Sequence, residues 1–199
     1  MKLESLFEDW KHNAIAAIGL AIGGDAYSQN TKQNSQIEQQ ELSIENLSKF
    51  ITKWEGFSSK MYVDTTGNKT VGYGFNLERR DASTILANHS LDLNKIIDLS
   101  QEISKEVAFK ILTKDVESSI KVAKNFVSNF NSLPNQVKEI LVDLVYNLGS
   151  TKIQEFKKFK AAIENKNFKS AADELENSKW AKQTKRRADN HIKTLRELK

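Results

Sequence analysis

Residues 54–74 read WEGFSSKMYVDTTGNKTVGYG, and this stretch decides the fold of the chain. Two strand-like segments, 61–63 and 69–73, flank a Thr-Gly-Asn turn, a pattern that predicts a β-hairpin. Gly67 lies in this turn, where we expect a positive φ that glycine adopts without steric cost. Asp64 then lies where the first strand gives way to the turn.

A helix is expected directly before the hairpin. Ser43 is a suitable N-cap, and apolar residues follow it at helical spacing, namely Ile44, Leu47, Ile51 and Trp54. The helix over 43–54 places Glu55 at its C-terminal end.

The helical period dominates from Asp81 onward. It predicts helices over 81–88, 104–116, 117–129, 135–148, 152–164, 168–178 and 184–198. The helix over 135–148 is the clearest, because Pro134 fits its first position and Gly149 can close its C-terminus. We therefore predict an α+β fold, mostly helical and two-lobed, with a small β-hairpin in the N-terminal lobe and a groove between the lobes.

Composition limits the classes of function. The 199 residues are 39% apolar, which is enough for one sizeable core. Cysteine is absent and the histidines, His12, His89 and His191, lack ligand spacing, so disulfides and metal catalysis are not expected. Residues 121–199 carry 17 Lys and Arg against 9 Asp and Glu, and this basic half favours an anionic partner: nucleic acid, a membrane or a bacterial wall polymer.

The N-terminal part of the chain predicts a leader and a linker. Residues 14–24 form an apolar run of 11, too short for an ordinary membrane-spanning helix but typical of a signal-peptide hydrophobic region. Acidic residues before the run depart from the charge of an export signal, so the alternatives are export, transient membrane association or a short packed helix. We expect a leader over 1–28, a polar linker over 29–41 and a folded domain over 42–199.

Glu55, Asp64 and Thr70 are the candidate catalytic residues. Breaking a glycosidic bond uses one carboxyl that protonates the leaving oxygen and an ionised carboxylate on the other face of the sugar. Trp54 and Phe57 flank Glu55, so we expect low polarity to raise the pKa of Glu55 and suit it as the general acid. Asp64 lies in a polar turn that keeps it ionised, and the Thr70 hydroxyl could hold a water beside it.

These residues carry a family resemblance. The order Glu55-Gly-Phe, Asp64, a turn at Gly67 and then Thr70-Val-Gly-Tyr-Gly resembles the bacteriophage T4-type lysozymes, glycoside hydrolase family 24. Later motifs agree in order and spacing with the second lobe of that family: Asp143–Gly149, Phe156, Ala171-Ala172, Ser178–Trp180, Gln183-Thr184 and Arg187-Ala188. The resemblance covers residues 43–198.

The resemblance implies a lysozyme-like fold and a peptidoglycan-degrading muramidase. Such an enzyme hydrolyses the β-1,4 bond between N-acetylmuramic acid and N-acetylglucosamine with inversion. In that family the glutamate donates the proton, while the aspartate and threonine position the water, which assigns Glu55, Asp64 and Thr70 as catalytic. Asn76 and Tyr146 would contact the glycan, and neither a cofactor nor a metal is implied.

The implied setting is a monomeric phage endolysin that binds bacterial peptidoglycan and acts in the periplasm or cell wall of the host. Two alternatives stay open: a non-catalytic wall-binding or phage structural module with a lysozyme fold, and a basic nucleic-acid-binding helical protein. The basic cluster Lys182, Lys185, Arg186 and Arg187 lacks interleaved aromatic residues, so a surface for an acidic wall polymer is favoured over one for nucleic acid.

Overall fold

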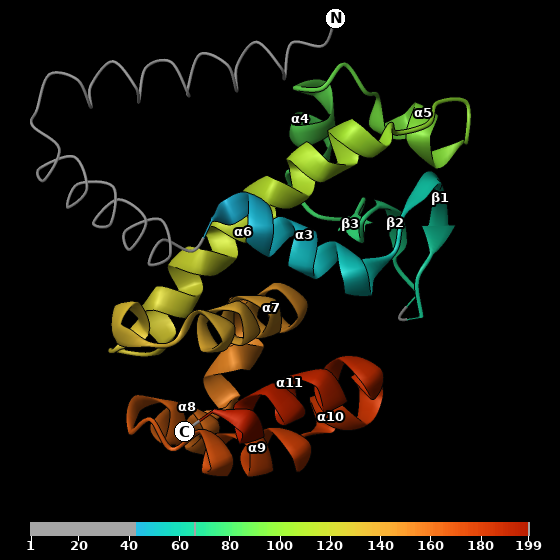
Figure 1. Cartoon of the computed structure of the whole chain (residues 1–199). Helices are drawn as coiled ribbons and strands as arrows, with labels where there is room; N and C mark the ends of the chain where they lie inside the picture. The colour runs from blue at the N-terminus through green and yellow to red at the C-terminus, as the bar shows by residue number, and fades with distance from the viewer. Residues whose placement is uncertain (1–42, 66, 199) are drawn as a thin grey trace, which may run out of the picture. The chain divides into compact units, whose positions relative to one another are not determined.

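The computed structural model describes residues 43–65 and 67–198 (Figure 1). The expected leader over 1–28 and linker over 29–41 lie outside the described residues. Within the described part, one antiparallel sheet of three strands accompanies many helices, which confirms the α+β, mostly helical fold. None of the helices in this part of the chain has both the length and the apolar character needed to cross a membrane.

Helix α3 (Ile44–Glu55) forms as the sequence predicts. Its N-cap is Ser43, whose hydroxyl accepts a hydrogen bond from the backbone N–H of Asn46 at 3.4 Å. Gly56, at the C-cap, has φ 68°, a conformation that ends the helix directly after Glu55. The first candidate carboxyl therefore lies at a helix terminus.

The sheet has the strand order β1 (Ser58–Val63), β2 (Lys69–Gly72) and β3 (Phe75–Asn76). Strands β1 and β2 form the expected hairpin, and Gly67 in the turn has φ 92°. Strand β3 was not expected from the sequence. It makes β2 the central strand, so that Thr70 pairs with Tyr62 on one side and with Asn76 on the other.

The remaining helices are α4 (Ala82–Ala87), α5 (Leu93–Ile97), α6 (Lys105–Phe126), α7 (Asn135–Lys152), α8 (Lys157–Glu164), α9 (Phe168–Glu176), α10 (Lys179–Thr184) and α11 (Arg186–Glu197), with 3-10 turns η1 (Phe130–Ser132) and η2 (Ile153–Glu155). The two helices expected over 104–116 and 117–129 are a single helix, α6, because no breaker interrupts its buried face between Val116 and Ser119. The predicted start of the helix over 184–198 is also wrong: α11 begins at Arg186, because Lys185, at φ 37°, separates it from α10.

Helix α7 is the central element of the described residues, and it packs against α3, α6 and α11. Its residues from Ile140 to Val145 are all buried, so the middle of the helix is enclosed on every side. Pro134 is its N-cap rather than its first residue, and Gly149, at φ 77°, kinks it near the C-terminal end. One consequence is that Asp143 lies inside the core.

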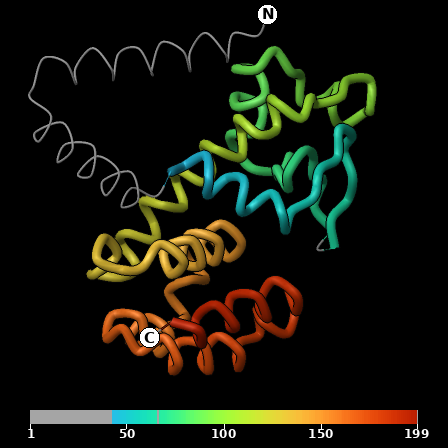
Figure 2. Tube along the Cα trace, in the orientation of Figure 1, coloured from blue at the N-terminus to red at the C-terminus, as the bar shows by residue number. Residues whose placement is uncertain are grey.

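The trace in Figure 2 runs from α3 through the sheet and α4–α6 into α7, and then into a helical group made of α8 to α11. The last helix, α11, returns to pack on α9 and α7. Trp180 and Phe168 are buried in this group, as expected of core residues. The Trp180 indole also donates a hydrogen bond to Oδ1 of Asn147 on α7 at 2.7 Å, which joins α10 to the central helix.

Candidate active site

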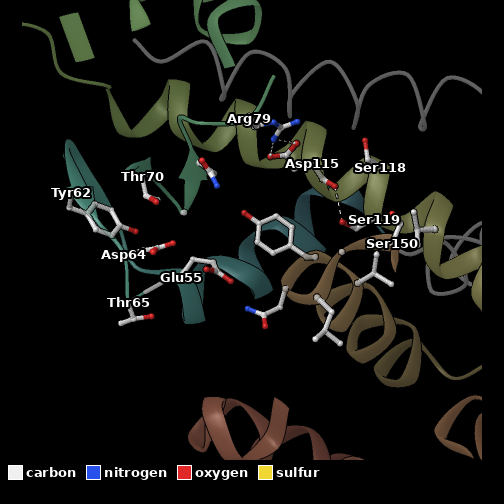
Figure 3. Close-up of a pocket in the computed structure, with 18 residues that line it drawn as sticks. Glu55, Tyr62, Asp64, Thr65, Thr70, Arg79, Asp115, Ser118, Ser119 and Ser150 are labelled. Carbon is white, nitrogen blue, oxygen red and sulfur yellow. Dashed lines mark hydrogen bonds and ion pairs between the residues drawn. The ribbon is translucent and has the colours of Figure 1, made fainter. Parts of the chain in front are cut away.

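A cleft of about 720 Å³ opens between the end of α3, the sheet, α6 and α7 (Figure 3). The five residues singled out from the sequence all line it: Glu55, Asp64, Thr70, Asn76 and Tyr146. Figure 3 shows the carboxyl groups of Glu55 and Asp64 directed toward the same space, with Thr70 beside them. The fold therefore collects in one cleft residues that are up to 91 positions apart in the sequence.

Glu55 is nearly enclosed, with its side chain 17% exposed. Its Oε1 lies 2.7 Å from Nη1 of Arg187, and a Cβ added at Gly74 would lie 3.2 Å from its Oε2. Burial raises the pKa of Glu55 above its ordinary value, Arg187 opposes the rise, and the negative charge of Asp143 adds to it. A carboxyl that keeps its proton above the usual pH range is suited to general-acid chemistry.

Arg187 joins Glu55 to a second, deeper carboxylate. Its Nε and Nη2 donate to Oδ2 and Oδ1 of Asp143 at 2.8 and 2.6 Å. Nε2 of His191 lies 2.6 Å from Oδ2 of the same carboxylate, and both Asp143 and His191 are fully buried. We call Glu55, Arg187, Asp143 and His191 the buried charge network.

The pKa of Asp143 moves in the opposite direction to that of Glu55. Burial alone would raise it, but the hydrogen bonds from Arg187 and His191 and the charge of Arg187 outweigh burial and hold the pKa of Asp143 below its usual range. Arg187 thus lies between a carboxyl that tends to keep its proton and one that stays ionised.

The buried charge network was not found from the sequence. Arg187 had been grouped with the basic surface cluster, which is wrong, because it is buried and paired with two carboxylates. Two features of the sequence pointed to it: Asp143 interrupts an apolar run, and Arg187 and His191 are spaced i, i+4 on one helix. Only the folded chain shows that these features meet.

Asp64 is held by its own turn. Its Oδ1 accepts the backbone N–H of Asn68 at 2.9 Å, and its Oδ2 accepts the Asn68 side-chain amide at 3.3 Å. The backbone closes the same turn, since the N–H of Asp64 donates to the Asn68 carbonyl at 2.9 Å and the N–H of Gly67 donates to the Asp64 carbonyl at 3.0 Å. These contacts are local and involve neutral donors, as the turn sequence suggested.

Thr70 and Tyr62 complete this side of the cleft. Thr70 is 3% exposed, and its hydroxyl donates to the Asn68 carbonyl at 3.2 Å. Burial raises the pKa of the Tyr62 phenol, and the negative charges of Glu55 and Asp64 raise it further. Because Tyr62 is influenced by both carboxyl groups, the three side chains form one electrostatic environment.

The two expected glycan contacts occupy different positions in the cleft. Tyr146 projects from α7, and its hydroxyl donates to the Tyr73 carbonyl at 3.1 Å, a bond that ties the central helix to the turn before β3. Asn76 lies in β3, where its Oδ1 accepts the N–H of Glu78 at 2.7 Å. Both residues line the cleft.

An ion pair that the sequence did not indicate borders the cleft near α6 (Figure 3). Nη1 of Arg79 lies 3.0 Å from both carboxylate oxygens of Asp115, while its Nε and Nη2 bind Asp81 at 2.6 and 2.9 Å. Since two carboxylates surround one guanidinium, this end of the cleft carries no surplus positive charge.

Comparison with known proteins gives consistent matches. Residues 52–197 match the family model described as phage lysozyme. The chain is 32% identical over 160 residues to "Probable T4-type lysozyme 2" of Dictyostelium discoideum, which covers 73% of this chain and 93% of that protein. It is 27% identical over 149 residues to "Probable T4-type lysozyme 1" of the same organism, covering 71% of this chain and 88% of that protein.

Proposed function

The chain belongs to the phage lysozyme family, and from this premise we propose that it hydrolyses the β-1,4 bond between N-acetylmuramic acid and N-acetylglucosamine in bacterial peptidoglycan, with inversion at the anomeric carbon. One observation carries the proposal: Glu55, Asp64 and Thr70 line a single cleft, and burial raises the pKa of Glu55 there. An acid and an ionised partner on opposite sides of a sugar are what glycoside hydrolysis requires.

The roles follow from the surroundings of each group. Glu55 donates its proton to the glycosidic oxygen as the bond breaks. Asp64, oriented by the neutral donors of Asn68, accepts a proton from a water that the Thr70 hydroxyl helps to place, and this water attacks the anomeric carbon from the face opposite Glu55. The Tyr146 ring supplies an apolar surface for a sugar and Asn76 supplies a polar contact.

The proposed setting is lysis of a bacterial host by a phage, with the enzyme acting as a monomer in the periplasm or cell wall. The name of the family supports a phage origin for the protein. Both named relatives, however, come from Dictyostelium discoideum, so proteins named as T4-type lysozymes also occur outside phages. Intact-mass analysis after expression in a bacterium checks the expected leader: loss of residues 1–28 supports cleaved export, and an intact chain in a washed membrane fraction supports association through residues 14–24.

The catalytic assignment is tested with Glu55→Gln. An amide cannot donate the proton, so release of reducing ends from purified peptidoglycan should fall by at least about a hundredfold. Glu45→Gln is the matched control, because it makes the same change on the same helix at an exposed position whose ion pair is with Lys49. We expect that variant to match the wild type.

Mass analysis of the released muropeptides identifies the bond, and the anomeric proton signals of the first products report inversion. A Glu55→Gln enzyme with wild-type turnover would remove Glu55 as the general acid. Wild-type protein that sediments with peptidoglycan but releases no reducing ends would favour the non-catalytic wall-binding module instead.

A further inference from the structure

Arg187 divides its three guanidinium nitrogens unequally between two carboxylates. One nitrogen, Nη1, contacts Glu55, whereas Nε and Nη2 both contact Asp143. A guanidinium that presents its full fork to one carboxylate forms two parallel charge-assisted bonds and strongly favours the ionised form. The number of guanidinium nitrogens that contact Glu55 therefore depends on where Asp143 holds the guanidinium.

His191 fixes the far side of Asp143. Its ring lies between Phe50 and Trp180, stacked at centroid distances of 6.0 and 5.8 Å, and the edge of Trp54 meets it at 6.2 Å. These three aromatic rings hold the imidazole in the plane that directs Nε2 at the carboxylate.

The polar atoms of the imidazole indicate its tautomer. A separation of 2.6 Å between Nε2 and Oδ2 of Asp143 requires a proton between them, and the Asp143 carboxylate is the acceptor. Nδ1 is buried and has no hydrogen-bond partner among the described residues. Since an unpaired N–H donor or a charge is costly in such a position, the geometry favours a neutral ring with its proton on Nε2.

We propose that Asp143 and His191 are positioning residues for glycan hydrolysis: His191 fixes Asp143, and Asp143 draws Arg187 away from Glu55 so that Glu55 receives a single nitrogen and can keep its proton. The inference rests on the proposed function, in which Glu55 is the general acid. Neither Asp143 nor His191 lines the cleft, so neither touches the glycan, and the contact that links them to Glu55 is Arg187.

Other titratable groups surround the two ends of this network. Tyr62 on β1 and Tyr146 on α7 face Glu55, and the pKa of each phenol is raised by burial first and by Glu55 second. Glu139 on α7 and Lys53 on α3 lie on the His191 side, where burial raises the pKa of Glu139 and the charge of Lys53 opposes the rise. A change at Asp143 therefore reaches Glu55 in two ways that act in the same direction: through the position of Arg187, and through the direct effect of the Asp143 charge on the pKa of Glu55.

The test measures the pKa of the Glu55 carboxyl directly, by ¹³C NMR titration of glutamate-labelled protein, with Glu55→Gln identifying its signal. Asp143→Asn keeps the side-chain shape but removes the charge, so Arg187 turns its fork toward Glu55, the direct effect of the Asp143 charge is lost, and both changes lower the pKa of Glu55. The alkaline limb of the kcat/KM profile then moves to lower pH. At a pH above the wild-type limb we expect a loss of about tenfold, carried by kcat, with KM unchanged.

Variants at His191 should act in the opposite direction. His191→Leu removes the donor, so the Asp143 charge is shared with Arg187 alone, the guanidinium is drawn farther from Glu55, and the pKa of Glu55 rises by less than it falls in Asp143→Asn. His191→Gln retains an N–H donor at a similar reach and should restore the wild-type value. His89→Leu, in the connection between α4 and α5, is the matched histidine control and should leave the Glu55 titration unchanged.

Several outcomes overturn the inference. Equal Glu55 pKa values in the wild type, Asp143→Asn and His191→Leu would do so, even if those variants melt at lower temperature, because that result assigns a purely structural role. If Asp143→Asn does not fold, ¹⁵N shifts of the wild-type His191 ring decide: a proton on Nδ1 with a bare Nε2 contradicts the proposal. If Glu55→Gln stays active while the pKa shifts occur as described, the proposed function fails and the network stands.

Discussion

The two carboxyl groups of the cleft are held in opposite ways. Glu55 is nearly enclosed and takes its cation from Arg187, 132 residues later in the chain. Asp64 lies in a hairpin turn, where Asn68, four residues away, donates two hydrogen bonds to its carboxylate. The proposed acid thus depends on tertiary packing, whereas its partner depends on a local turn, and substitutions should affect the two sides of the cleft to different degrees.

The largest difference is expected from Arg187→Ala. It leaves Asp143 fully buried without its cation, and removing one partner of a buried ion pair costs about 3–5 kcal/mol of unfolding free energy. Arg186→Ala is the control, since this exposed neighbour lies 5.7 Å from the centre of the Trp54 ring, a contact worth about 1 kcal/mol or less. Urea denaturation of the two variants measures the contrast, and equal losses would show that burial of Arg187 contributes nothing.

An intermediate effect is expected at two glycines, one beside Glu55 and one in the Asp64 turn. Gly74 and Gly67 have φ 80° and 92°, so alanine at either position costs about 1–2 kcal/mol of backbone strain. The methyl group added at Gly74 would lie 3.2 Å from Oε2 of Glu55, the proposed acid. The methyl group added at Gly67 would have no atom within 4 Å.

The two alanine variants should therefore separate stability from activity. Both melt at lower temperature, but kcat falls only in Gly74→Ala, by about tenfold or more, because a small displacement of a reacting group is costly. Equal kcat values in the two variants, measured on the same peptidoglycan, would mean that the position of Glu55 does not limit the rate.

The smallest effect is expected from Asn68→Ala in the Asp64 turn. The substitution removes the side-chain bond at 3.3 Å but keeps the backbone N–H at 2.9 Å. A hydrogen bond to a carboxylate contributes about 1.5 kcal/mol at the lower end of its range, as suits a length of 3.3 Å, so the unfolding free energy should fall by about that amount and kcat/KM by about tenfold at most. A hundredfold loss of kcat/KM would show that Asp64 is held less locally than the structure indicates.

The same contrast explains what the sequence could predict. Ser43 as an N-cap, the end of α3 at Glu55 and the turn at Gly67 are all fixed by neighbouring residues, and the structure confirms each of them. Strand β3 and the short helices α5 and α10 contain two, five and six residues, too few to show a period.

The burial of Arg187 could not be derived from its neighbours. The cluster of basic residues around it suggested a solvated face, and its two carboxylate partners come from α3 and α7. The candidate site was therefore predicted where local turns build it. It was missed where distant helices meet, although Asp143 in an apolar helix was a visible sign of a buried charge.

The contact between Glu55 and Arg187 joins the first described helix to the last one. Ribosomal synthesis delivers these helices in that order, so a growing polypeptide carries Glu55 long before α11 has emerged from the exit tunnel. Until α11 has emerged, the glutamate has no Arg187 guanidinium beside it and the core around α7 lacks the packing of this helix. Emergence of α11 is thus the step that assembles this side of the cleft, and a product terminated before α11 is left without it.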